Sequence, residues 1–461
     1  MTGDTRIEKD SMGGMEVPAD ALYGASTQRA VLNFPISGRP VPPVLIHVYG
    51  LIKMAAAQTN AELGLLDTEI AARIIGAAKE VASGQHDGQF PIDIYQTGSG
   101  TSTNTNVNEV IAHLASGGGA EVHPNDHVNL GQSSNDTFPT AIHLATASAI
   151  QSVLVPALDE LAIALETKAE EFHEVLKIGR THLMDATPVR LGQEFGGWAA
   201  QVRHSSIRAQ KAVEALLELP LGGTAVGTGL NTHPQFAGQA IEKLSSWTGL
   251  PLVEAENHFE AQSAKDACVE AHGHLSTIAV SLHKIACDIR LLGSGPRCGF
   301  GEISLPATQP GSSIMPGKVN PVMSESLAMV AARVAGNQTT VTWCGAGGFL
   351  ELNVSMPLIA ACLLESVELL ANSANAFRSK CVEGITANVE RCNELIEYSL
   401  SMVTALAPKI GYDKASAIAK ESVATGRTVR ELCEGRLEEL GISHGELAEL
   451  LDPARMAGEQ G

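Results

Sequence analysis

Aromatic and basic residues are scarce in this 461-residue chain, and both shortages restrict what it can be. Phe, Trp and Tyr make up 4% of the residues, whereas hydrophobic residues as a whole make up 44%. Ala, Leu, Val and Ile must therefore fill a large core, which favours long helices over β-sandwiches. The formal net charge is −20, so the chain lacks the basic footprint of nucleic-acid-binding proteins, and no nucleic-acid partner is expected.

Signals for export, membrane insertion and phosphate binding are also missing. The N-terminal sequence MTGDTRIEKD contains no apolar stretch of the kind that secretory signals need. There is no uninterrupted run of about 18 apolar residues, so no membrane span is expected. No G-K-[ST] occurs and no G-x-G-x-x-G follows a strand pattern, which argues against a phosphate loop at Gly98 and Gly100 or at 222–229. We therefore expect a cytoplasmic protein.

The eight cysteines occur singly, and no C-x-x-C pair is present. Zinc and iron–sulfur sites need clustered thiolates, so no metal site of this kind is expected. Buried, reduced thiols explain these cysteines better.

Three regions of the chain differ in pattern, and we predict three domains. Residues 1–132 mix Pro, Gly and short helical patches, and residues 133–397 are strongly helical. Residues 398–461 contain shorter amphipathic pieces and form a predicted small C-terminal helical domain. The predicted fold class is mainly α, with a central bundle of long helices.

The clearest helical signal lies in residues 264–292. Its apolar residues alternate steps of three and four, as in a coiled-coil seam; they are Cys268, Ala271, Leu275, Ile278, Leu282, Ile285, Ile289 and Leu292. Ala279, Val280 and Ala286 form a second apolar face. A helix of this length spans about 44 Å, at about 1.5 Å per residue, which one small domain covers poorly. The helix therefore belongs either to a bundle within one chain or to a bundle shared between subunits.

Four polar loops, at 97–106, 131–136, 179–188 and 311–321, each lead into a predicted helix. All are rich in small hydroxyl or amide residues, and free N–H groups at helix N-termini attract anions. Any one loop is explained well by ordinary helix capping. Four of them, if they converge, predict a site for a small ligand with several carboxylate oxygens. Local donors must then outweigh the negative net charge, helped by salt screening beyond ~8–10 Å.

The 311–321 loop is the most informative of the four. Gly311 and Gly317 permit unusual backbone geometry, and we expect a mobile loop. Asn320 is the predicted N-cap of the next helix, and Pro321 suits its first position. Lys318 is either a carboxylate ligand or an ordinary surface lysine.

Two further residues have the chemistry for proton transfer. His182 lies in a polar loop between Arg180 and Asp185 rather than on an apolar helix face, which makes it a better candidate for an acid–base role than most of the fifteen histidines, although a structural role stays open. Glu325, one turn past Asn320, either pairs with a histidine and raises its basicity or is a solvated helix residue.

These segments together resemble the fumarase/aspartase superfamily, and class II fumarases in particular. The similarity begins at RIEKD (6–10) and EVPAD (16–20) and continues to GYDK (411–414). The 311–321 loop resembles the superfamily signature. His182, Ser134 and Gly317 favour fumarase, because aspartases typically carry glutamine, threonine and alanine at these positions.

The resemblance implies a mainly α, three-domain fold whose long-helix bundle assembles into a tetrameric core. It implies a homotetramer in which three subunits build each active site. The implied reaction is the reversible hydration of fumarate to L-malate in the tricarboxylic acid cycle, with no metal or organic cofactor. An aspartate ammonia-lyase and a non-catalytic homologue, like the lens crystallins of the superfamily, remain as alternatives.

The resemblance also implies roles for individual residues. Ser312 matches the base that removes the C3 proton of malate, and His182, oriented by Glu325, matches the residue that activates water or protonates the leaving hydroxyl. The positions matching the carboxylate-binding set are Ser99, Gly100, Thr101, Ser133, Ser134, Asn135, Thr181, Ser313, Lys318, Val319 and Asn320. A second dicarboxylate site is matched by His123, Pro124, Asn125 and Asp126. Because a free serine is a poor base, Ser312 needs nearby donors or Lys318 to stabilise its alkoxide.

Overall fold

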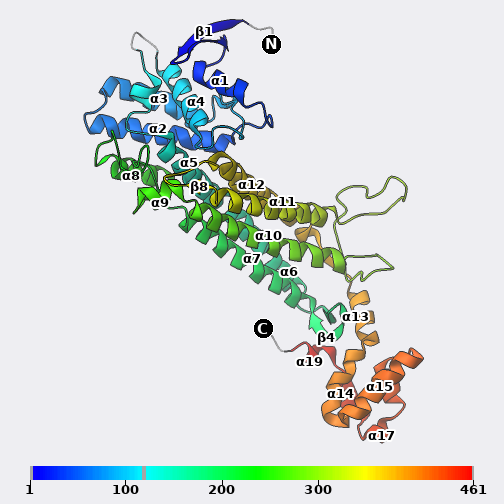
Figure 1. Ribbon diagram of the computed structural model, residues 1–461. Coiled ribbons are helices and arrows are strands. Elements are labelled where there is room, and N and C mark those ends of the chain that lie inside the picture. The colour runs from blue at the N-terminus through cyan, green and yellow to red at the C-terminus, as the bar shows by residue number, and fades with distance from the viewer. Residues whose placement is uncertain (1–3, 117–120, 459–461) are drawn as a thin grey trace. The chain divides into compact units, whose positions relative to one another are not determined.

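The computed structural model describes residues 4–116 and 121–458, and most of them are helical, which confirms the predicted fold class (Figure 1). All described strands lie in two-stranded sheets. The chain divides into two compact units, each built from three stretches of sequence. The first unit comprises Met1–Pro156, Ile207–Ala279 and Ala331–Ala371, and the second comprises Ala157–Ser206, Val280–Val330 and Asn372–Gly461. The predicted domain boundaries at 132/133 and 397/398 stay a prediction.

The first unit contains the N-terminal helices and the hairpin of β1 with β2. Its elements are β1 (Thr5–Asp10), β2 (Gly13–Pro18), α1 (Ala25–Asn33), α2 (Pro43–Glu62), α3 (Thr68–Ala82), α4 (Thr101–Ala115), η2 (Pro124–Val128), α5 (Ser134–Ala149), β5 (Glu218–Leu219), α8 (Phe236–Thr248), β6 (Val253–Glu254) and α9 (His258–Ser263). Helix α2 contacts α3, α5 and α8, and it is the centre of this arrangement. Gly50 permits the close approach of α3, because a Cβ there would lie 2.6 Å from the backbone nitrogen of Ala82.

Long helices contribute residues to both units. They are α6 (Val155–Glu171), α7 (Leu191–Glu214), α10 (Asp266–Leu292), α11 (Val322–Gly345) and α12 (Met356–Lys380). The long helix predicted at 264–292 is confirmed as α10, and every residue of its predicted seam is buried. The second apolar face is only partly buried: Ala279 and Ala286 are covered, but Val280 is 67% exposed in the single chain.

Two helical segments are long and apolar enough to cross a membrane, by length and composition alone, although the lack of an apolar run led us to expect no membrane span. They are Ser134–Glu171 and Met356–Gly384, with mean hydropathies of 1.5 and 1.3 in their most apolar windows. That expectation considered only uninterrupted apolar runs, whereas these helices intersperse Ser, Thr or Asn among Ala and Leu. Of each window, 67% is buried inside the protein, as in the core helices of globular proteins.

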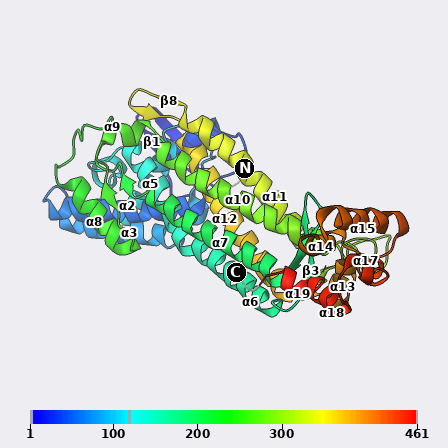
Figure 2. The same ribbon diagram turned by 90° about the horizontal axis from the view of Figure 1, so that it is seen from below.

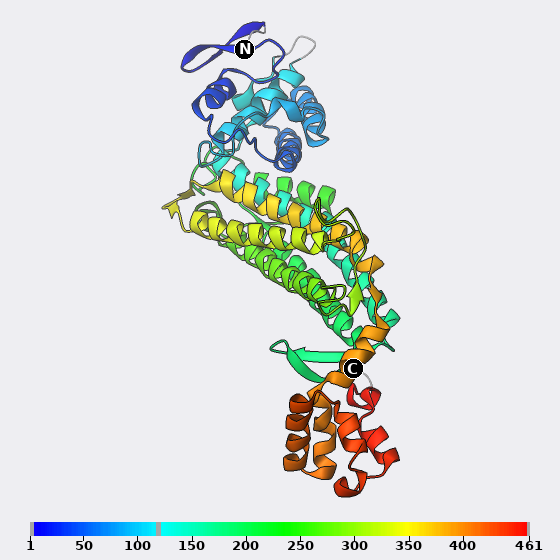
Figure 3. The ribbon, with the colours of Figure 1, turned by 90° about the vertical axis from the view of Figure 1, so that its right-hand side faces the viewer.

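The second unit contains the hairpin of β3 (Leu176–Thr181) with β4 (Met184–Arg190) and the C-terminal helices. The helices are α13 (Val389–Tyr398), α14 (Val403–Ile410), α15 (Tyr412–Thr425), α16 (Val429–Glu434), α17 (Leu437–Leu440), α18 (His444–Leu450) and α19 (Pro453–Met456). Helix α13 contacts β3 and α19 contacts β4 (Figures 2 and 3). The C-terminal helices share an apolar core that includes Leu406, Ile418 and Leu432.

The expectation of buried, reduced thiols holds for most of the cysteines. None is in a disulfide, and Cys268, Cys362, Cys381, Cys392 and Cys433 are buried. Cys287 and Cys344 are half-buried and Cys298 is exposed, so burial does not extend to all eight. Burial raises the pKa of the Cys268 thiol to about 12, which makes it unreactive at neutral pH.

Candidate active site

Three hydroxyl side chains from two predicted loops meet in the first unit. Ser99 Oγ lies 2.7 Å from Thr101 Oγ1, which in turn lies 2.7 Å from Ser134 Oγ. Thr101 is the first residue of α4 and Ser134 the first of α5, so two helix N-termini meet at these hydroxyls. We call Ser99, Thr101 and Ser134 the hydroxyl cluster. Free N–H groups and hydroxyls at this point suit a carboxylate.

Helix α4 begins earlier than the sequence predicted. Residues 101–106 were expected to be loop, with the helix beginning at 107, yet Thr103, Asn104 and Asn106 are buried in the first turns of α4. Runs of polar residues favour a loop, but here tertiary hydrogen bonds bind several of these side chains. Asn106 Nδ2, for example, donates to the carbonyl of Gln89 at 3.0 Å.

Gly100 is the N-cap of α4 and has a φ of +72°. A Cβ at this position would lie 1.9 Å from Phe138 Cδ2, so backbone conformation and packing both require glycine. We expect Gly100→Ala to destabilise the protein by about 3 kcal/mol, since overpacking and backbone strain cost roughly 1–3 kcal/mol each. Thermal denaturation measures this effect. Gly38→Ala is the matched control, because Gly38 has a φ of +66° but open space around its Cβ position. Equal destabilisation by both variants would contradict the packing argument.

Ser133 and Asn135 serve the start of α5. Ser133 is its N-cap and forms a capping box with Asp136, while Asn135 Nδ2 donates to the carbonyl of Ala225 at 2.8 Å. Asp136 is fully buried, which raises its pKa, and backbone N–H groups of Ser133, Thr224 and Gly222 act in the opposite direction. Ser133 and Asn135, both predicted to bind a carboxylate, therefore also have structural roles. The sequence alone does not distinguish the two kinds of role.

His182 lies at the tip of the β3–β4 hairpin rather than in a loop before a helix. Thr181 pairs with Met184, and the two residues between them, His182 and Leu183, have φ values of +56° and +62°. The predicted helix start at Thr187 and Pro188 is wrong, because both residues lie in β4 and α7 begins at Leu191. Two consecutive left-handed residues form a type I′ turn, which usually contains Asn or Gly. Backbone strain of this kind is typical of functional sites. The His182 side chain at the tip of the turn is exposed.

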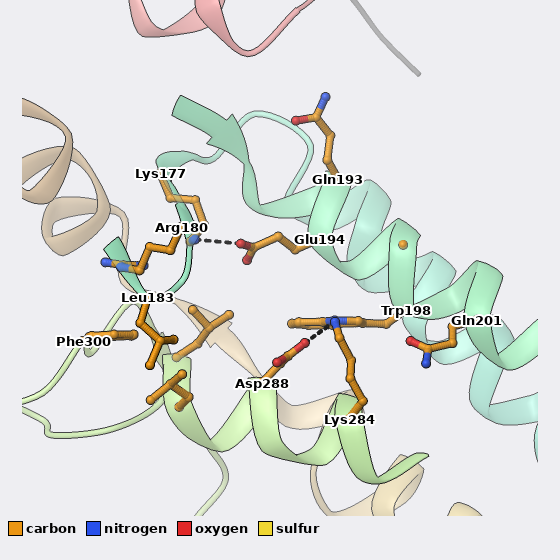
Figure 4. A pocket seen from close by; sticks show the side chains of 13 residues that line it. Lys177, Arg180, Leu183, Gln193, Glu194, Trp198, Gln201, Lys284, Asp288 and Phe300 are labelled. Carbon is orange, nitrogen blue, oxygen red and sulfur yellow. Dashed lines mark hydrogen bonds and ion pairs between the residues drawn. The ribbon is translucent and has the colours of Figure 1, made fainter. Parts of the chain in front are cut away.

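A buried charge network involves strand β3 of this hairpin, and Figure 4 shows its members Lys177, Arg180 and Glu194. Lys177 Nζ lies 2.9 Å from Glu194 and 3.3 Å from Glu302, and Arg180 donates to Glu302 at 2.9 Å. The Arg180 guanidinium also lies 4.1 Å from the centre of the Phe300 ring. Burial raises the pKa of Glu194, and Lys177 opposes that shift. Sequence reasoning noted only Arg180, because no local pattern marks its partners, which lie far away in the chain.

Three members of the network, Lys177, Arg180 and Glu194, also line a cavity of about 450 Å³ in the second unit. Two other residues that line the cavity also contact each other, since Trp198 Nε1 donates to the Asp288 carboxylate at 3.1 Å. Three cations and two carboxylates line this cavity, so the local charges largely balance; they are Lys177, Arg180 and Lys284, and Glu194 and Asp288 (Figure 4). The cavity is therefore less suited to a dianion than the helix N-termini of the hydroxyl cluster.

Ser312 lies in the 311–321 loop with two backbone donors on its hydroxyl. Its Oγ accepts from the N–H of Ile314 at 3.2 Å and from that of Met315 at 2.9 Å. Donors of this kind favour an ionised oxygen. Serines in ordinary turns also accept such bonds, so the activation of Ser312 as a base stays a prediction.

The loop is closed at its base by two hydrogen bonds. The Gly311 N–H donates to the Lys318 carbonyl at 2.9 Å, and Asn320 Nδ2 donates to the Gly311 carbonyl at 2.7 Å. Helix α11 begins at Val322, and its first backbone hydrogen bond runs from the N–H of Glu325 to the carbonyl of Pro321. The prediction that Asn320 caps this helix is therefore wrong, because its side chain closes the loop instead.

The remaining predicted residues of this region lie on the surface. Ser313, Lys318, Val319, Thr181 and Glu325 are all exposed. Within residues 4–116 and 121–458, no hydrogen bond or ion pair joins His182 to Glu325, so their pairing stays a prediction. The predicted site residues are divided between the two units: 99–101 and 133–135 in the first, and 181–182 and 312–325 in the second.

The predicted second dicarboxylate site lies in the first unit at the start of η2. His123 Nδ1 accepts from the N–H groups of Asn125 at 3.3 Å and Asp126 at 3.1 Å, and Pro124 is the first residue of η2. The imidazole thus caps this short helix. Its binding role stays a prediction. Across the described part of the chain, no group of three or more His, Cys, Asp and Glu is placed to hold a metal ion.

The chain is similar to known proteins over most of its length. Residues 13–336 match a family model described as "Lyase", and residues 402–458 match one described as "Fumarase C C-terminus". The fumarate hydratase class II of Methylorubrum extorquens is 54% identical over 435 residues, covering 93% of this chain and 92% of that protein. The Mycobacterium tuberculosis protein of the same name is 55% identical over 427 residues, covering 92% and 90%. The crystal structure of a class II fumarase from Schistosoma mansoni matches with a TM-score of 0.94 and 41% identity over 99% of both chains. This chain therefore belongs to the lyase family of the class II fumarate hydratases.

Proposed function

We propose that this protein catalyses the reversible hydration of fumarate to L-malate, by general acid–base anti addition of water. The observation that carries the proposal is the Ser312 hydroxyl, which accepts two backbone N–H hydrogen bonds in the exposed 311–321 loop. These donors stabilise an alkoxide, and an alkoxide is basic enough to remove a proton from carbon.

The reaction is simplest to follow from malate. The Ser312 alkoxide takes the C3 proton, and the negative charge moves into the adjacent carboxylate to give an aci-carboxylate. His182 then donates a proton to the C2 hydroxyl, which leaves as water, and the double bond of fumarate forms. Hydration of fumarate follows the same steps in reverse.

Charge stabilisation is the main task of the other residues. The hydroxyl cluster lies at two helix N-termini, and Lys318 adds a cation on the 311–321 loop. Donors that are already in place when the aci-carboxylate forms lower the barrier most, because they need no reorganisation. The helix starts hold these donors rigidly, whereas the residues that transfer protons lie on loops.

A single assay separates this function from its alternatives. Purified protein is incubated with L-malate, fumarate or L-aspartate, with EDTA present, and the absorbance of the fumarate double bond is followed. We expect malate and fumarate to interconvert and aspartate to be inert. Turnover of aspartate alone would indicate an ammonia-lyase, and inertness towards all three would indicate a structural homologue. Loss of activity in EDTA would contradict the proposed metal independence.

We further propose that the protein is a homotetramer in which three subunits build each active site. Large apolar side chains are exposed on the long helices and beside them: Val280 on α10, Met329 and Trp343 on α11, and Phe349 and Leu350 just after α11. Exposed apolar surface of this extent is typical of association faces. The polar residues of the site are also divided between two compact units, which a shared site explains.

The expected mass in light scattering is about 193 kDa, four times the 48.2 kDa of one chain. The sharing of sites has its own test. Inactive Ser312→Ala and His182→Asn chains, denatured and refolded together, should recover part of the wild-type rate, because some sites in mixed tetramers contain both intact residues. A 48.2 kDa species, or no recovery in correctly assembled mixtures, would contradict this proposal.

We assign the protein to the cytoplasm and its reaction to the tricarboxylic acid cycle. A hydratase that interconverts two C4 dicarboxylates consumes the product of a dehydrogenation and supplies a secondary alcohol for oxidation. Fractionation of the source cells tests the location, and recovery of the protein in the membrane fraction would contradict it.

A further inference from the structure

A buried lysine lies beneath the hydroxyl cluster. Lys53, on α2, has no exposed surface. Its Nζ donates to Asn104 Oδ1 at 2.9 Å, to Asn129 Oδ1 at 3.0 Å and to Gln132 Oε1 at 2.9 Å. These three neutral amides use all three protons of the ammonium group, so the contacts are complete only when Lys53 is charged.

The three acceptors connect Lys53 to both helix starts of the cluster. Asn104 lies in the first turn of α4, where its N–H donates to the Gly100 carbonyl at 3.0 Å. Gln132 directly precedes Ser133, the N-cap of α5. The ammonium group therefore ties together the two N-termini that carry Thr101 and Ser134. No residue of the predicted site is itself a partner of Lys53.

The charge of Lys53 is not cancelled by a direct ion pair. In the described part of the chain, no salt bridge links it to a carboxylate. The titratable groups that face it are Tyr49 on the same helix, with its ring centre 6.0 Å from Nζ, and the buried Asp136 on α5. The Asp136 carboxylate is bound instead by the N–H groups of Ser133, Gly222 and Thr224. A cation and two helix N-termini thus contribute the same sign of potential to one place.

Burying an ammonium group without an ionic partner is costly. At Lys53 three amide hydrogen bonds offset that cost, and their acceptors lie at the starts of α4 and α5. We propose that Lys53 is a positioning residue for the dicarboxylate, which holds the hydroxyl cluster together and supplies the buried positive charge that attracts the substrate there. The proposal rests on the proposed function. It also explains how a chain with a net charge of −20 binds a dianion.

The first test is Lys53→Met, which removes the charge and keeps most of the length. We expect the KM for fumarate and for L-malate to rise about tenfold, the effect of one partly screened charge, while kcat stays within about threefold. We expect KM to change more than kcat because Lys53 contacts amide side chains and not the reacting atoms. Assays at about pH 6 keep the group charged in the wild type, because burial lowers the pKa of Lys53 to about 7, against an opposing effect of Asp136.

Lys265→Met is the matched control. Lys265 is also in the first unit and 1% exposed, but its Nζ donates only to the backbone carbonyls of Ala261, Gln262 and Ala264. Both variants lose a buried cation, so both should lose stability, but only Lys53→Met should raise KM. An equal rise in both variants would overturn the proposal, because it would reflect general damage to the fold.

A second variant keeps the proposal testable if Lys53→Met does not fold. Asn129→Asp places a carboxylate on the ammonium group and retains the hydrogen bonds that Asn129 Oδ1 accepts from Lys53 and from Asn104, at 3.0 and 3.2 Å. It loses the bond that Asn129 Nδ2 donates to the Gln132 carbonyl at 3.1 Å, and the new ion pair with Lys53 should offset this loss. We expect the variant to fold, to neutralise the charge and to raise KM about tenfold. An unchanged KM in this variant would overturn the role of the charge.

Failure of the proposed function has a different signature. A wild-type protein that does not hydrate fumarate would contradict that function, yet calorimetric titration with L-malate would still measure binding. Weaker binding by Asn129→Asp than by wild type in that titration supports the role of Lys53, and equal binding overturns it.

Discussion

Ser312→Ala should lower the kcat for fumarate hydration by about 10²–10⁴-fold, the usual contribution of a positioned proton-transfer group, and should change KM little. The variant removes the only atom of this side chain that can take a proton. The backbone donors of Ile314 and Met315 remain, because they belong to the loop itself. Steady-state kinetics with fumarate and with L-malate measure the effect in both directions.

Ser313→Ala is the matched control for this experiment. Ser313 is the neighbouring exposed hydroxyl of the same loop and is assigned to carboxylate binding. Its loss should raise KM more than it lowers kcat, because uniform binding contributes to KM. A Ser312→Ala enzyme with a near-normal kcat would remove Ser312 as the base.

His182→Asn should also lower kcat by about 10²–10⁴-fold, because the group that exchanges a proton with the C2 hydroxyl is lost. Asparagine is the best replacement for geometric reasons. His182 has a φ of +56°, and asparagine tolerates this conformation well, so the turn should keep its shape. Circular dichroism and thermal denaturation are expected to match the wild type, and the loss should appear in turnover alone.

Leu183→Asn provides the comparison within the same turn. Leu183 has a φ of +62° and is 63% exposed, so this change should relieve strain without removing a group that transfers protons. We expect a stability gain of about 1 kcal/mol and a kcat close to that of the wild type. If Leu183→Asn lost as much activity as His182→Asn, the effect would belong to the turn and not to the imidazole.

Much of the fold could be predicted from local patterns. The seam of α10 and its length followed from apolar spacing alone, and every seam residue is buried. The β3–β4 hairpin was not predicted, because its turn contains His182 and Leu183 instead of the Asn or Gly that marks such turns. The start of α4 was missed for a related reason: Asn104 and Asn106 look like loop residues until their distant partners are known.

The candidate site shows the same division. Residue types and loop positions marked the four polar loops and His182 as candidates. The resemblance to the fumarase/aspartase superfamily then implied the roles of Ser312, His182 and the hydroxyl cluster. The two donors on Ser312 and the contact between Thr101 and Ser134 required coordinates. The pairing of His182 with Glu325 stays a prediction.

By itself, the sequence determined the mainly α fold class, the long helix at 264–292 and the set of groups available for chemistry. These properties depend on composition and on spacing along one helix, both of which are local. Only the tertiary structure decided that Lys53 reaches Asn104 and that Arg180 reaches Glu302, because these partners lie 51 and 122 residues apart. Contacts at such separations leave no periodic trace in the sequence, since they depend on how complete helices pack.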